Sequence, residues 1–482
     1  MNIQEGANAM KIRGMWRPGQ GERPRGIIPA VAAGLLALSA CDLTPREGQA
    51  THAALTPLTA LEQVEAPTAR GSGEPNLHAA ADGQVYLSWF EPLGDGRHAL
   101  RFSVMDPGAG GVLGDLGSTD AAPAPGTGAA GSSANAGSPT WTPPRTIVTG
   151  DDFFVNWADF PSMFELADGT LAAHWPRRSG EGTFEYDVEV AWSPDGGDTW
   201  SEPVIPHRDG TLSEHGFVSL FPWEDGSLGA VWLDGRHYVG WDEEAGAPSG
   251  EGRPDHPEMT LRFTTLTPTG LGPEKLLDGR ICECCQTSAA ITSRGPIVVY
   301  RNRTEDEIRD TWTVRYVDGA WTEPAPVYED GWEIRACPVN GPMVAADGDR
   351  VAVAWFTAAH DQPRVRLAFS HDAGESFEYP VQVDDGDPMG RVAVTLLDDG
   401  DALVTWLERT GDDAAVRIRR VTPDGTLGPS ETVALSSPAR ASGFPRMARS
   451  GDHLVFAWTD ILGEEGSRVR TAVARVPGTG GE

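Results

Sequence analysis

The chain has 482 residues, of which 38 are Lys or Arg and 70 are Asp or Glu, so its formal net charge at pH 7 is −32. Such a surface repels nucleic acids and anionic membranes and argues against both as direct partners. Its 58 glycines and 38 prolines are dense, and no long stretch repeats apolar residues at the helical period, which excludes a helical solenoid. We therefore expect short strands joined by turns.

Residues 1–40 have the layout of a secretory signal peptide. Basic residues precede an apolar run, "IIPAVAAGLLALSA", which ends at Cys41 and is too short to span a membrane as a helix. The ending "LSAC" resembles the bacterial lipobox, in which the cysteine is lipidated and becomes the first residue. This resemblance implies an extracytoplasmic lipoprotein that touches the membrane only through its lipid. Asp42 resembles an inner-membrane retention signal. The alternative is an ordinary secretory signal with an incidental cysteine.

A repeat runs through the rest of the chain. Seven times a turn is followed by a short apolar strand that ends in an aromatic residue, as in "ADGQVYLSW", "EDGSLGAVW" and "DGDRVAVAW". The aromatic residues are Trp89, Trp175, Trp232, Tyr300, Trp355, Trp406 and Trp458. Each copy follows another short strand, and most precede an alternating strand and a further extended segment. Four short strands per unit of roughly 50 to 70 residues describe the blade of a β-propeller.

The repeat predicts an all-β propeller of seven four-stranded blades in one domain, residues 54–476, with six blades as the alternative. The seventh unit lacks a clear fourth strand, and we expect "LTALEQV", near residue 60, to supply it and close the ring. Residues 107–140 are nearly all Gly, Ala, Ser and Pro, which indicates a disordered insert in the first blade. Residues 41–53 would form a tether and 477–482 a C-terminal tail.

Two turns, "SPDGGDTW" (193–200) and "SHDAGESF" (370–377), fit the pattern Ser-x-Asp-x-Gly-x-Ser/Thr-aromatic. The pattern resembles the Asp-box of the sialidase-like (BNR repeat) β-propeller superfamily, and the whole chain resembles a bacterial lipoprotein member of it. In such turns the aspartate caps backbone amides and a glycine takes the positive-φ position. Asp195 and Asp372 are therefore expected to be structural, on the face opposite the usual site.

Charged residues gather in segments that blade geometry places at one mouth of the central channel. The segment leading into each innermost strand and the loop after each second strand open onto the same face. Propeller loops without a functional role tend to be short and rich in Gly, Asn and Ser. Here they carry Asp159, Glu214, His215, Asp234, Arg236, Arg301, Arg303, Glu307, Arg309 and Arg391. Salt bridges between blades are the alternative role for each of them.

The resemblance to sialidases implies roles for part of this set. Sialidases bind the substrate carboxylate with arginines, use a tyrosine activated by a glutamate as nucleophile, and use an aspartate as acid/base catalyst. The implied substrate-binding residues are Arg236, Arg301 or Arg303, Arg391 and Asp234. The implied catalytic residues are Asp159 as acid/base, Glu214, and Tyr300 or Tyr238 as nucleophile. The family's Arg-Ile-Pro motif is missing, because "EPNLHAA" stands in its place, and seven blades depart from the six of true sialidases.

The expected ligand on this interpretation is an acidic glycan, which the protein would bind and, as an exo-sialidase-like glycoside hydrolase, cleave. We expect a monomer. The alternative is a non-catalytic envelope propeller, which would act as a scaffold for other proteins or carry a metal or redox site made by its cysteines.

Four cysteines follow Cys41, and three of them lie within "ICECCQTSAA": Cys282, Cys284 and Cys285. The fourth, Cys337, leads into the next blade at the equivalent position. Because oxidation outside the cytoplasm favours disulfides, we expect Cys337 to be bridged to one cysteine of the cluster. The remaining two would form a strained bridge, stay free, or bind copper or zinc with His215 as the nitrogen donor. No cofactor besides such a metal is expected.

Overall fold

The computed structural model describes residues 55–108, 139–240 and 257–477. The predicted signal peptide, Cys41, the tether, nearly all of the 107–140 insert and residues 478–482 lie outside these ranges. Within them the chain forms strands and four single-turn 3-10 helices, none of which is long and apolar enough to cross a membrane. The helices are η2 (Arg236–Tyr238), η3 (Ala359–Asp361), η4 (Arg440–Ser442) and η5 (Gly463–Glu465).

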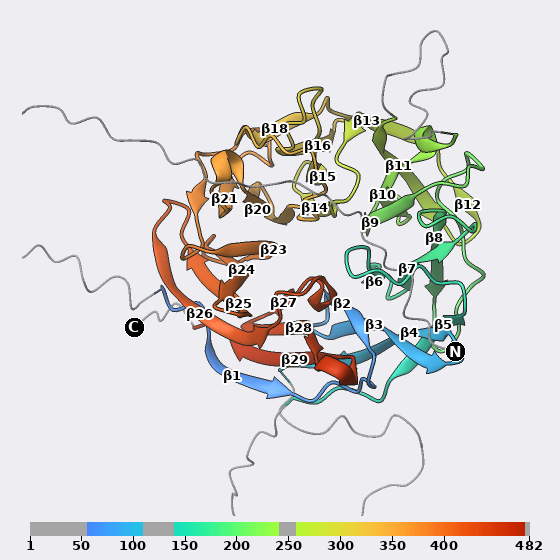
Figure 1. Cartoon of the computed structure of the whole chain (residues 1–482), viewed down its shortest axis with the longest axis horizontal. Helices are drawn as coiled ribbons and strands as arrows, with labels where there is room; N and C mark the ends of the chain where they lie inside the picture. Colours follow the sequence, from blue (N-terminus) through green and yellow to red (C-terminus); the bar gives the residue numbers. More distant parts are fainter. Residues whose placement is uncertain (1–54, 109–138, 241–256, 478–482) are drawn as a thin grey trace, which may run out of the picture. The chain divides into compact units, whose positions relative to one another are not determined.

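The strands form seven antiparallel blades around a central axis (Figure 1). Blade 1 contains β2 (Gly73–Ala79), β3 (Val85–Gly94), β4 (Arg97–Met105) and β5 (Arg145–Gly150). Blade 2 contains β6 (Ser162–Glu165), β7 (Leu171–Arg178) and β8 (Tyr186–Ser193), with an outer bridge between Val190 and Val204. Blade 3 contains β9 (His215–Pro222), β10 (Leu228–Asp234), β11 (Met259–Thr267), β12 (Gly270–Leu271) and β13 (Lys275–Ile281).

Blade 4 contains β14 (Ser288–Thr292), β15 (Gly295–Arg301), β16 (Thr311–Val317), β17 (Ala320–Trp321) and β18 (Ala325–Tyr328). Blade 5 contains β19 (Met343–Asp347), β20 (Arg350–Thr357), β21 (Arg364–Ser370) and β22 (Val381–Gln382). Blade 6 contains β23 (Pro388–Leu396), β24 (Ala402–Thr410), β25 (Asp413–Val421) and β26 (Leu427–Ser436). Blade 7 contains β27 (Arg446–Ser450), β28 (His453–Ile461), β29 (Ser467–Arg475) and β1 (Thr59–Val64).

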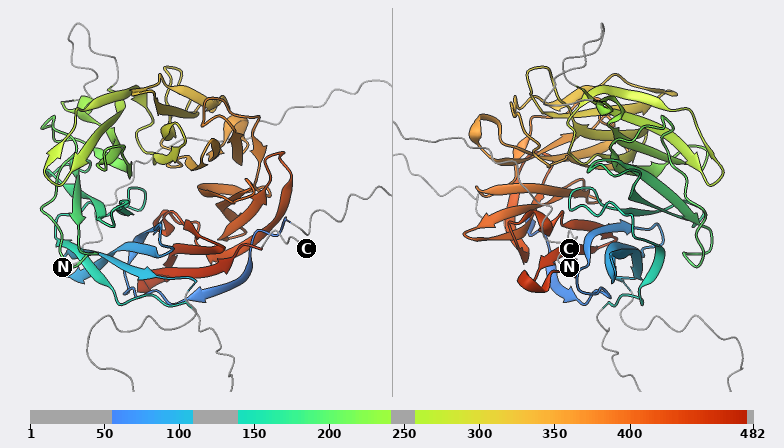
Figure 2. Two further views of the ribbon diagram at one scale, coloured as in Figure 1. Left: turned by 180° about the vertical axis from the view of Figure 1, so that it is seen from behind. Right: turned by 45° about the vertical axis from the view of Figure 1, so that its right-hand side comes forward.

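The first strand of the described residues completes the last blade, as the sequence predicted. Strand β1 pairs antiparallel with β29, from Thr59 opposite Arg475 to Val64 opposite Thr471. Both further views keep this blue strand beside the red one (Figure 2). The side chain of Trp141 donates to Thr471 Oγ1 (2.9 Å), and Thr471 donates to the carbonyl of Val64 (2.7 Å). The blade count is therefore seven, and the ring is closed by pairing that joins the two ends of the domain.

The aromatic residue of the repeat is the buried core of each blade. All seven are at most 3% exposed. Five of the six tryptophans donate their indole N–H to a carboxylate, and Tyr300 donates its hydroxyl to one: Trp89–Glu91, Trp175–Glu189, Trp232–Asp234, Trp355–Asp330, Trp406–Glu408 and Tyr300–Asp278. A buried indole needs such a partner, because an unpaired polar group in the core is costly.

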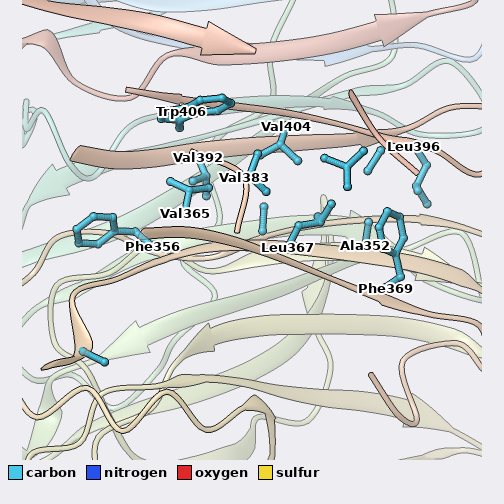
Figure 3. Close-up of a cluster of buried hydrophobic side chains, with 14 of the residues drawn as sticks. Ala352, Phe356, Val365, Leu367, Phe369, Val383, Val392, Leu396, Val404 and Trp406 are labelled. Carbon is cyan, nitrogen blue, oxygen red and sulfur yellow. The ribbon is translucent and has the colours of Figure 1, made fainter. Parts of the chain in front are cut away.

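Apolar side chains fill the space between neighbouring blades. Figure 3 shows one such cluster, in which Ala352, Phe356 and Leu367 of blade 5 face Val392 and Val404 of blade 6. A second strand that is covered on both sides loses the polar alternation of a surface strand, which explains why the repeat ends in an uninterrupted apolar run.

The two Ser-x-Asp turns have the same hydrogen bonds. Asp195 accepts from the backbone N–H of Thr199 (2.9 Å) and from its hydroxyl (2.6 Å). Asp372 accepts from the corresponding groups of Ser376 at 2.9 and 2.6 Å. Each aspartate thus holds its own hairpin together.

The aromatic–carboxylate contacts predict a stability effect. Trp355→Phe should lower the free energy of unfolding by about 2 to 4 kcal/mol, because it leaves a gap and removes a hydrogen bond to a charged group. Urea denaturation followed by circular dichroism measures this change. Leu435→Ala, at a side chain that is 73% exposed, is the control. Equal stabilities for the two variants would contradict the role given to the blade aromatics.

Candidate functional site

A cavity of about 1110 Å³ opens among the loops of blades 2 to 5 and 7. Its wall includes the aromatic side chains of Phe154, Trp157, Phe184 and Tyr238. The segments that line it include 182–186, which leads into β8, and 210–214, which leads into β9. A smaller cavity of about 250 Å³, lined largely by the innermost strands, shares Asp159 with it. The large cavity therefore lies next to the central channel.

Three titratable groups meet at the wall of this cavity. The hydroxyl oxygen of Tyr186 lies 2.8 Å from Asp159 Oδ2 and 3.1 Å from Glu214 Oε1. Tyr186 and Asp159 are buried, at 0% and 3% exposure, whereas Glu214 is partly exposed. Glu214 is therefore the group that a ligand in the cavity can reach, and the other two support it from behind.

Strand geometry fixes these three groups. Tyr186 is the first residue of β8 and forms a parallel bridge with Glu214, which directly precedes β9. The ring of Phe154 stacks on the tyrosine ring, with centroids 4.0 Å apart and an interplanar angle of 12°. Asp159 comes from the segment before β6 and accepts a second hydrogen bond, from the backbone N–H of Phe217 (3.0 Å). Every element of the trio thus belongs to blades 2 and 3.

The close approach depends on a glycine and on one strained residue. A Cβ atom at Gly216 would lie 2.1 Å from Asp159 Oδ2 and 2.4 Å from the Tyr186 hydroxyl, so no side chain fits there. The next residue, Phe217, has a φ of 54°, which is unfavourable for a bulky side chain. This turn of the backbone points the Phe217 N–H at Asp159. Strain of this kind is commonly kept where function requires it.

Burial raises the pKa of both carboxyl groups of the trio. Burial raises the pKa of Asp159 to about 6, although the hydrogen bonds from Tyr186 and Phe217 oppose the shift. Burial, with the nearby charge of Asp159, raises the pKa of Glu214 to about 8. The Tyr186 hydroxyl has one proton and can donate it to only one carboxyl group at a time. At neutral pH Glu214 therefore carries a proton of its own. With this proton Glu214 can donate a hydrogen bond to the hydroxyl oxygen of Tyr186, which in turn donates to Asp159.

The arginines predicted to bind a sugar carboxylate do not meet at this cavity. Arg236 forms ion pairs with Asp234 (2.6 Å) and Glu274 (2.9 Å). Arg301 is 1% exposed and donates to backbone carbonyls, including that of Asn340 (2.8 Å). Each of these guanidinium groups is already paired with groups of the protein, so neither is free to bind a ligand carboxylate.

The other two arginines are occupied in the same way. Arg303 pairs with Glu283 and Glu307, and Arg391 donates to Ser442 Oγ (2.7 Å) and lies over the ring of Trp157. Among the described residues the arginine that lines the cavity is Arg440, which the sequence did not single out.

Other predicted residues also lie elsewhere. Tyr300 is buried in the core of blade 4, where its hydroxyl donates a hydrogen bond to Asp278 (2.6 Å) rather than to Glu214. Tyr238 lines the cavity, but the tyrosine that donates a hydrogen bond to Glu214 is Tyr186. Asp234 is 0% exposed and accepts from Trp232 (2.9 Å), so its role is structural. The sequence did contain a signal for Tyr186, because it begins an alternating strand, "YDVEVAW", whose residues 186, 188 and 190 are buried.

The cysteines form a cluster beside the cavity. The sulfur of Cys282 lies 3.8 Å from that of Cys284 and 3.6 Å from that of Cys285, and Arg309 donates to it at 3.2 Å. Cys284 and Cys337 line the cavity. All four described cysteines are free thiols, so the predicted disulfide to Cys337 is not found. His215 does not join the cluster, because its ring stacks on that of His207 (3.6 Å between centroids).

The raised pKa of Asp159 predicts how stability depends on pH. A folded-state pKa of about 6, against an ordinary 3.8, means that the folded protein holds this proton more tightly than the unfolded chain. Its contribution to stability is complete below pH 3.8 and is lost as the pH rises through 6. The unfolding free energy of the wild type, relative to that of Asp159→Asn, should therefore fall by about 2 to 3 kcal/mol between pH 4 and pH 7.

Urea denaturation at both pH values measures this difference, with the exposed Asp412→Asn as control. A difference that stays constant, or that grows with pH, would contradict the buried position of Asp159.

No protein-family model matches the chain, and no curated protein matches it. Several solved structures are similar in fold. A protein of unknown function from Dyadobacter fermentans is 13% identical, with 87% of this chain and 99% of that chain covered and a TM-score of 0.48. The GH93 α-L-arabinofuranosidase of Fusarium graminearum is 15% identical, covering 66% and 92% with a TM-score of 0.43. The NanB sialidase of Streptococcus pneumoniae, as its K499G mutant, is 10% identical, covering 86% and 94% with a TM-score of 0.41.

Proposed function

We propose that the protein is a glycoside hydrolase and that Glu214 is its proton donor. The observation that carries this proposal is the position of Glu214, which faces the cavity while its carboxyl group contacts a buried tyrosine and, through it, a buried aspartate. A carboxyl group with a pKa of about 8 is protonated at neutral pH and can donate to a leaving oxygen. Tyr186 and Asp159 are positioning residues that hold it in place.

A second carboxylate is available for the other half of the reaction. Glu283 lines the same cavity and forms ion pairs with Arg303 and with Arg309 (2.6 Å). Glycosidases combine a protonated carboxyl group with an ionised one, which activates water or stabilises the positive charge that develops on the sugar. We assign these roles to Glu214 and Glu283. In the reaction the proton of Glu214 passes to the glycosidic oxygen, and the bond from that oxygen to the anomeric carbon breaks. The oxygen of a water molecule then bonds to the anomeric carbon, and the proton that the water loses passes to Glu283.

The charge of the cavity bears on the substrate. Four carboxyl groups line it, from Asp159, Glu185, Glu214 and Glu283, against one guanidinium, from Arg440. Because Glu214 holds a proton at neutral pH and Glu283 is paired with two arginines, the remaining balance is two carboxylates against one guanidinium. Such a site favours an uncharged ligand over an anionic one. The acidic glycan expected from the sequence depended on arginines that are occupied elsewhere. We therefore propose a glycan with an uncharged sugar in the cavity, packed against its aromatic walls.

The proposal predicts the effects of two substitutions. Glu214→Gln should lower kcat by about 10² to 10⁴ fold, because it removes the proton donor. Tyr186→Phe should lower kcat less, by roughly tenfold, and should shift the alkaline limb of the pH profile, since it changes the surroundings of Glu214. Release of reducing ends from a library of neutral and acidic oligosaccharides measures both. Glu224→Gln, in an exposed turn of blade 3, is the matched control.

Release of sialic acid or uronic acid alone would overturn the choice of a neutral sugar. If the wild type releases no reducing ends from any glycan, or if Glu214→Gln keeps full activity, the assignment as a glycoside hydrolase is wrong.

A second candidate function, binding of a soft metal ion by the cysteines, is favoured by the spacing of their sulfur atoms. Cys282, Cys284 and Cys285 offer sulfurs that all lie within 4.8 Å of one another. The two separations of 3.6 and 3.8 Å match the edge, about 3.8 Å, of a tetrahedron of thiolates bound 2.3 Å from zinc. These thiols would supply the copper or zinc site that the sequence raised as an alternative to disulfides.

The thiol site predicts that protein purified without oxygen binds one Cu(I) per chain, and that Cys285→Ser abolishes this binding. Titration against a chromogenic copper chelator measures it, with Ser436→Ala as the control. Two disulfides and no bound metal, found by intact-mass and elemental analysis, would rule out this second candidate.

The proposed place of action rests on the sequence alone. We propose that the chain works outside the cytoplasm, held to the cell envelope by lipid on Cys41. The residues that support this lie outside the described ranges.

A further inference from the structure

A second cluster of metal-ligating side chains lies behind the trio. Asp187 follows Tyr186 on β8, and His215 follows Glu214 at the start of β9. Because successive side chains of a strand point to opposite faces, these two face away from the cavity while Tyr186 and Glu214 face it. His207, from the segment after β8, places its ring flat against that of His215. The cluster is therefore attached to the same strand ends as the candidate catalytic residues.

Three buried atoms of this cluster have no hydrogen-bond partner. They are Asp187 Oδ1, His207 Nε2 and His215 Nδ1. The oxygen lies 3.5 Å from His207 Nε2 and 3.4 Å from His215 Nδ1, which is long for hydrogen bonds. These separations match the edge, about 3.3 Å, of a tetrahedron of N and O ligands 2.0–2.1 Å from a metal ion. Unpaired buried polar atoms at this spacing are what an ion would satisfy.

The opposite edge of the His215 ring is held in the way that a metal-binding histidine is held. His215 Nε2 lies 3.2 Å from Asp209 Oδ2, and His207 Nδ1 lies 3.6 Å from the same oxygen. Asp209 is fixed in turn by the N–H of Thr211 (2.9 Å) and by Arg236 (3.1 Å). A carboxylate that accepts from the far nitrogen sets the tautomer and orientation of a ligating imidazole. This hydrogen bond leaves the near nitrogen of His215, Nδ1, as the one that can accept an ion.

We propose that Asp187, His207 and His215 bind a divalent first-row cation, with zinc as the best match. Two imidazoles and one carboxylate suit zinc, and the partly exposed side chain of Asp187 (20%) leaves one side for a water ligand. The two rings are parallel within 3°, so ion binding will tilt them towards each other at this edge. The ion fixes the strand ends that carry Tyr186 and Glu214. Its binding does not depend on the glycan chemistry proposed above.

The experiment uses the mature chain without a histidine tag, dialysed against EDTA and titrated with ZnCl₂ by calorimetry. To exclude the thiol cluster, the same titration is made in Cys285→Ser. We expect one zinc per chain in Cys285→Ser, with a further zinc in the wild type only if its thiols also bind, and an increase in Tm on zinc addition. Asp187→Asn and His207→Gln should weaken binding by at least about 100-fold, and Asp209→Asn by about 10 to 100-fold. His371→Gln, at a side chain that is 51% exposed, is the matched control.

Zinc K-edge absorption of zinc-loaded Cys285→Ser tests the ligands directly. The proposal predicts nitrogen and oxygen neighbours at 2.0–2.1 Å, whereas sulfur neighbours at 2.3 Å in this protein would assign the ion to the remaining cysteines and overturn it. Absence of stoichiometric zinc binding by Cys285→Ser would also overturn it, as would unchanged affinity in folded Asp187→Asn and His207→Gln. Loss of glycan hydrolysis with zinc binding intact would count against the hydrolase alone.

Discussion

The interaction on which this propeller depends is the hydrogen bond between a buried aromatic group and a carboxylate. In six blades the buried aromatic residue of the second strand donates an N–H or O–H to Asp or Glu. Each pair lets a large side chain fill the blade core without leaving a polar atom unpaired, although a carboxylate has to be taken from water to do so. Part of the acidic excess of the chain is therefore structural and lies inside the fold.

The candidate site is a variation on the same interaction. Tyr186 donates to Asp159 as Tyr300 donates to Asp278, but a second carboxyl group, Glu214, has been added on the cavity side. Two carboxyl groups that share one hydroxyl cannot both be ionised at low cost, so one of them holds a proton at neutral pH. The same kind of contact stabilises the core in other blades. At the cavity it holds Glu214 as a proton donor that a ligand can reach. Gly216 is the position that makes room for this crowding.

The fold could be predicted further than the site. Turn, apolar strand and terminal aromatic recur because every blade must bury the same strand on both sides, and this gave the strand pattern, the seven blades and the closing strand β1. Asp159 and Glu214 were found because they lie in segments that lead into innermost strands. Tyr186 was missed because it begins a third strand, where only the burial of alternate residues marks it.

The arginines illustrate a different limit. A sequence shows that Arg236 and Arg391 lie near the channel mouth, but it does not show which groups they contact. In a chain with 70 acidic and 38 basic residues, most guanidinium groups will find a carboxylate partner within the protein. Arg236 does so with Asp234 and Glu274, and its pairing with Asp209 helps to hold the histidines of the second cluster. Both sets of contacts give Arg236 a structural role.

The most direct test of the central claim is a crystal structure of Glu214→Gln with a glycan that the wild type cleaves. We expect the sugar to occupy the cavity against Phe154 and Trp157. Its glycosidic oxygen should lie within about 3.2 Å of the substituted side chain at position 214, the reach of a general acid. A glycan bound at another surface, or one whose glycosidic oxygen lies beyond the reach of position 214, would contradict it.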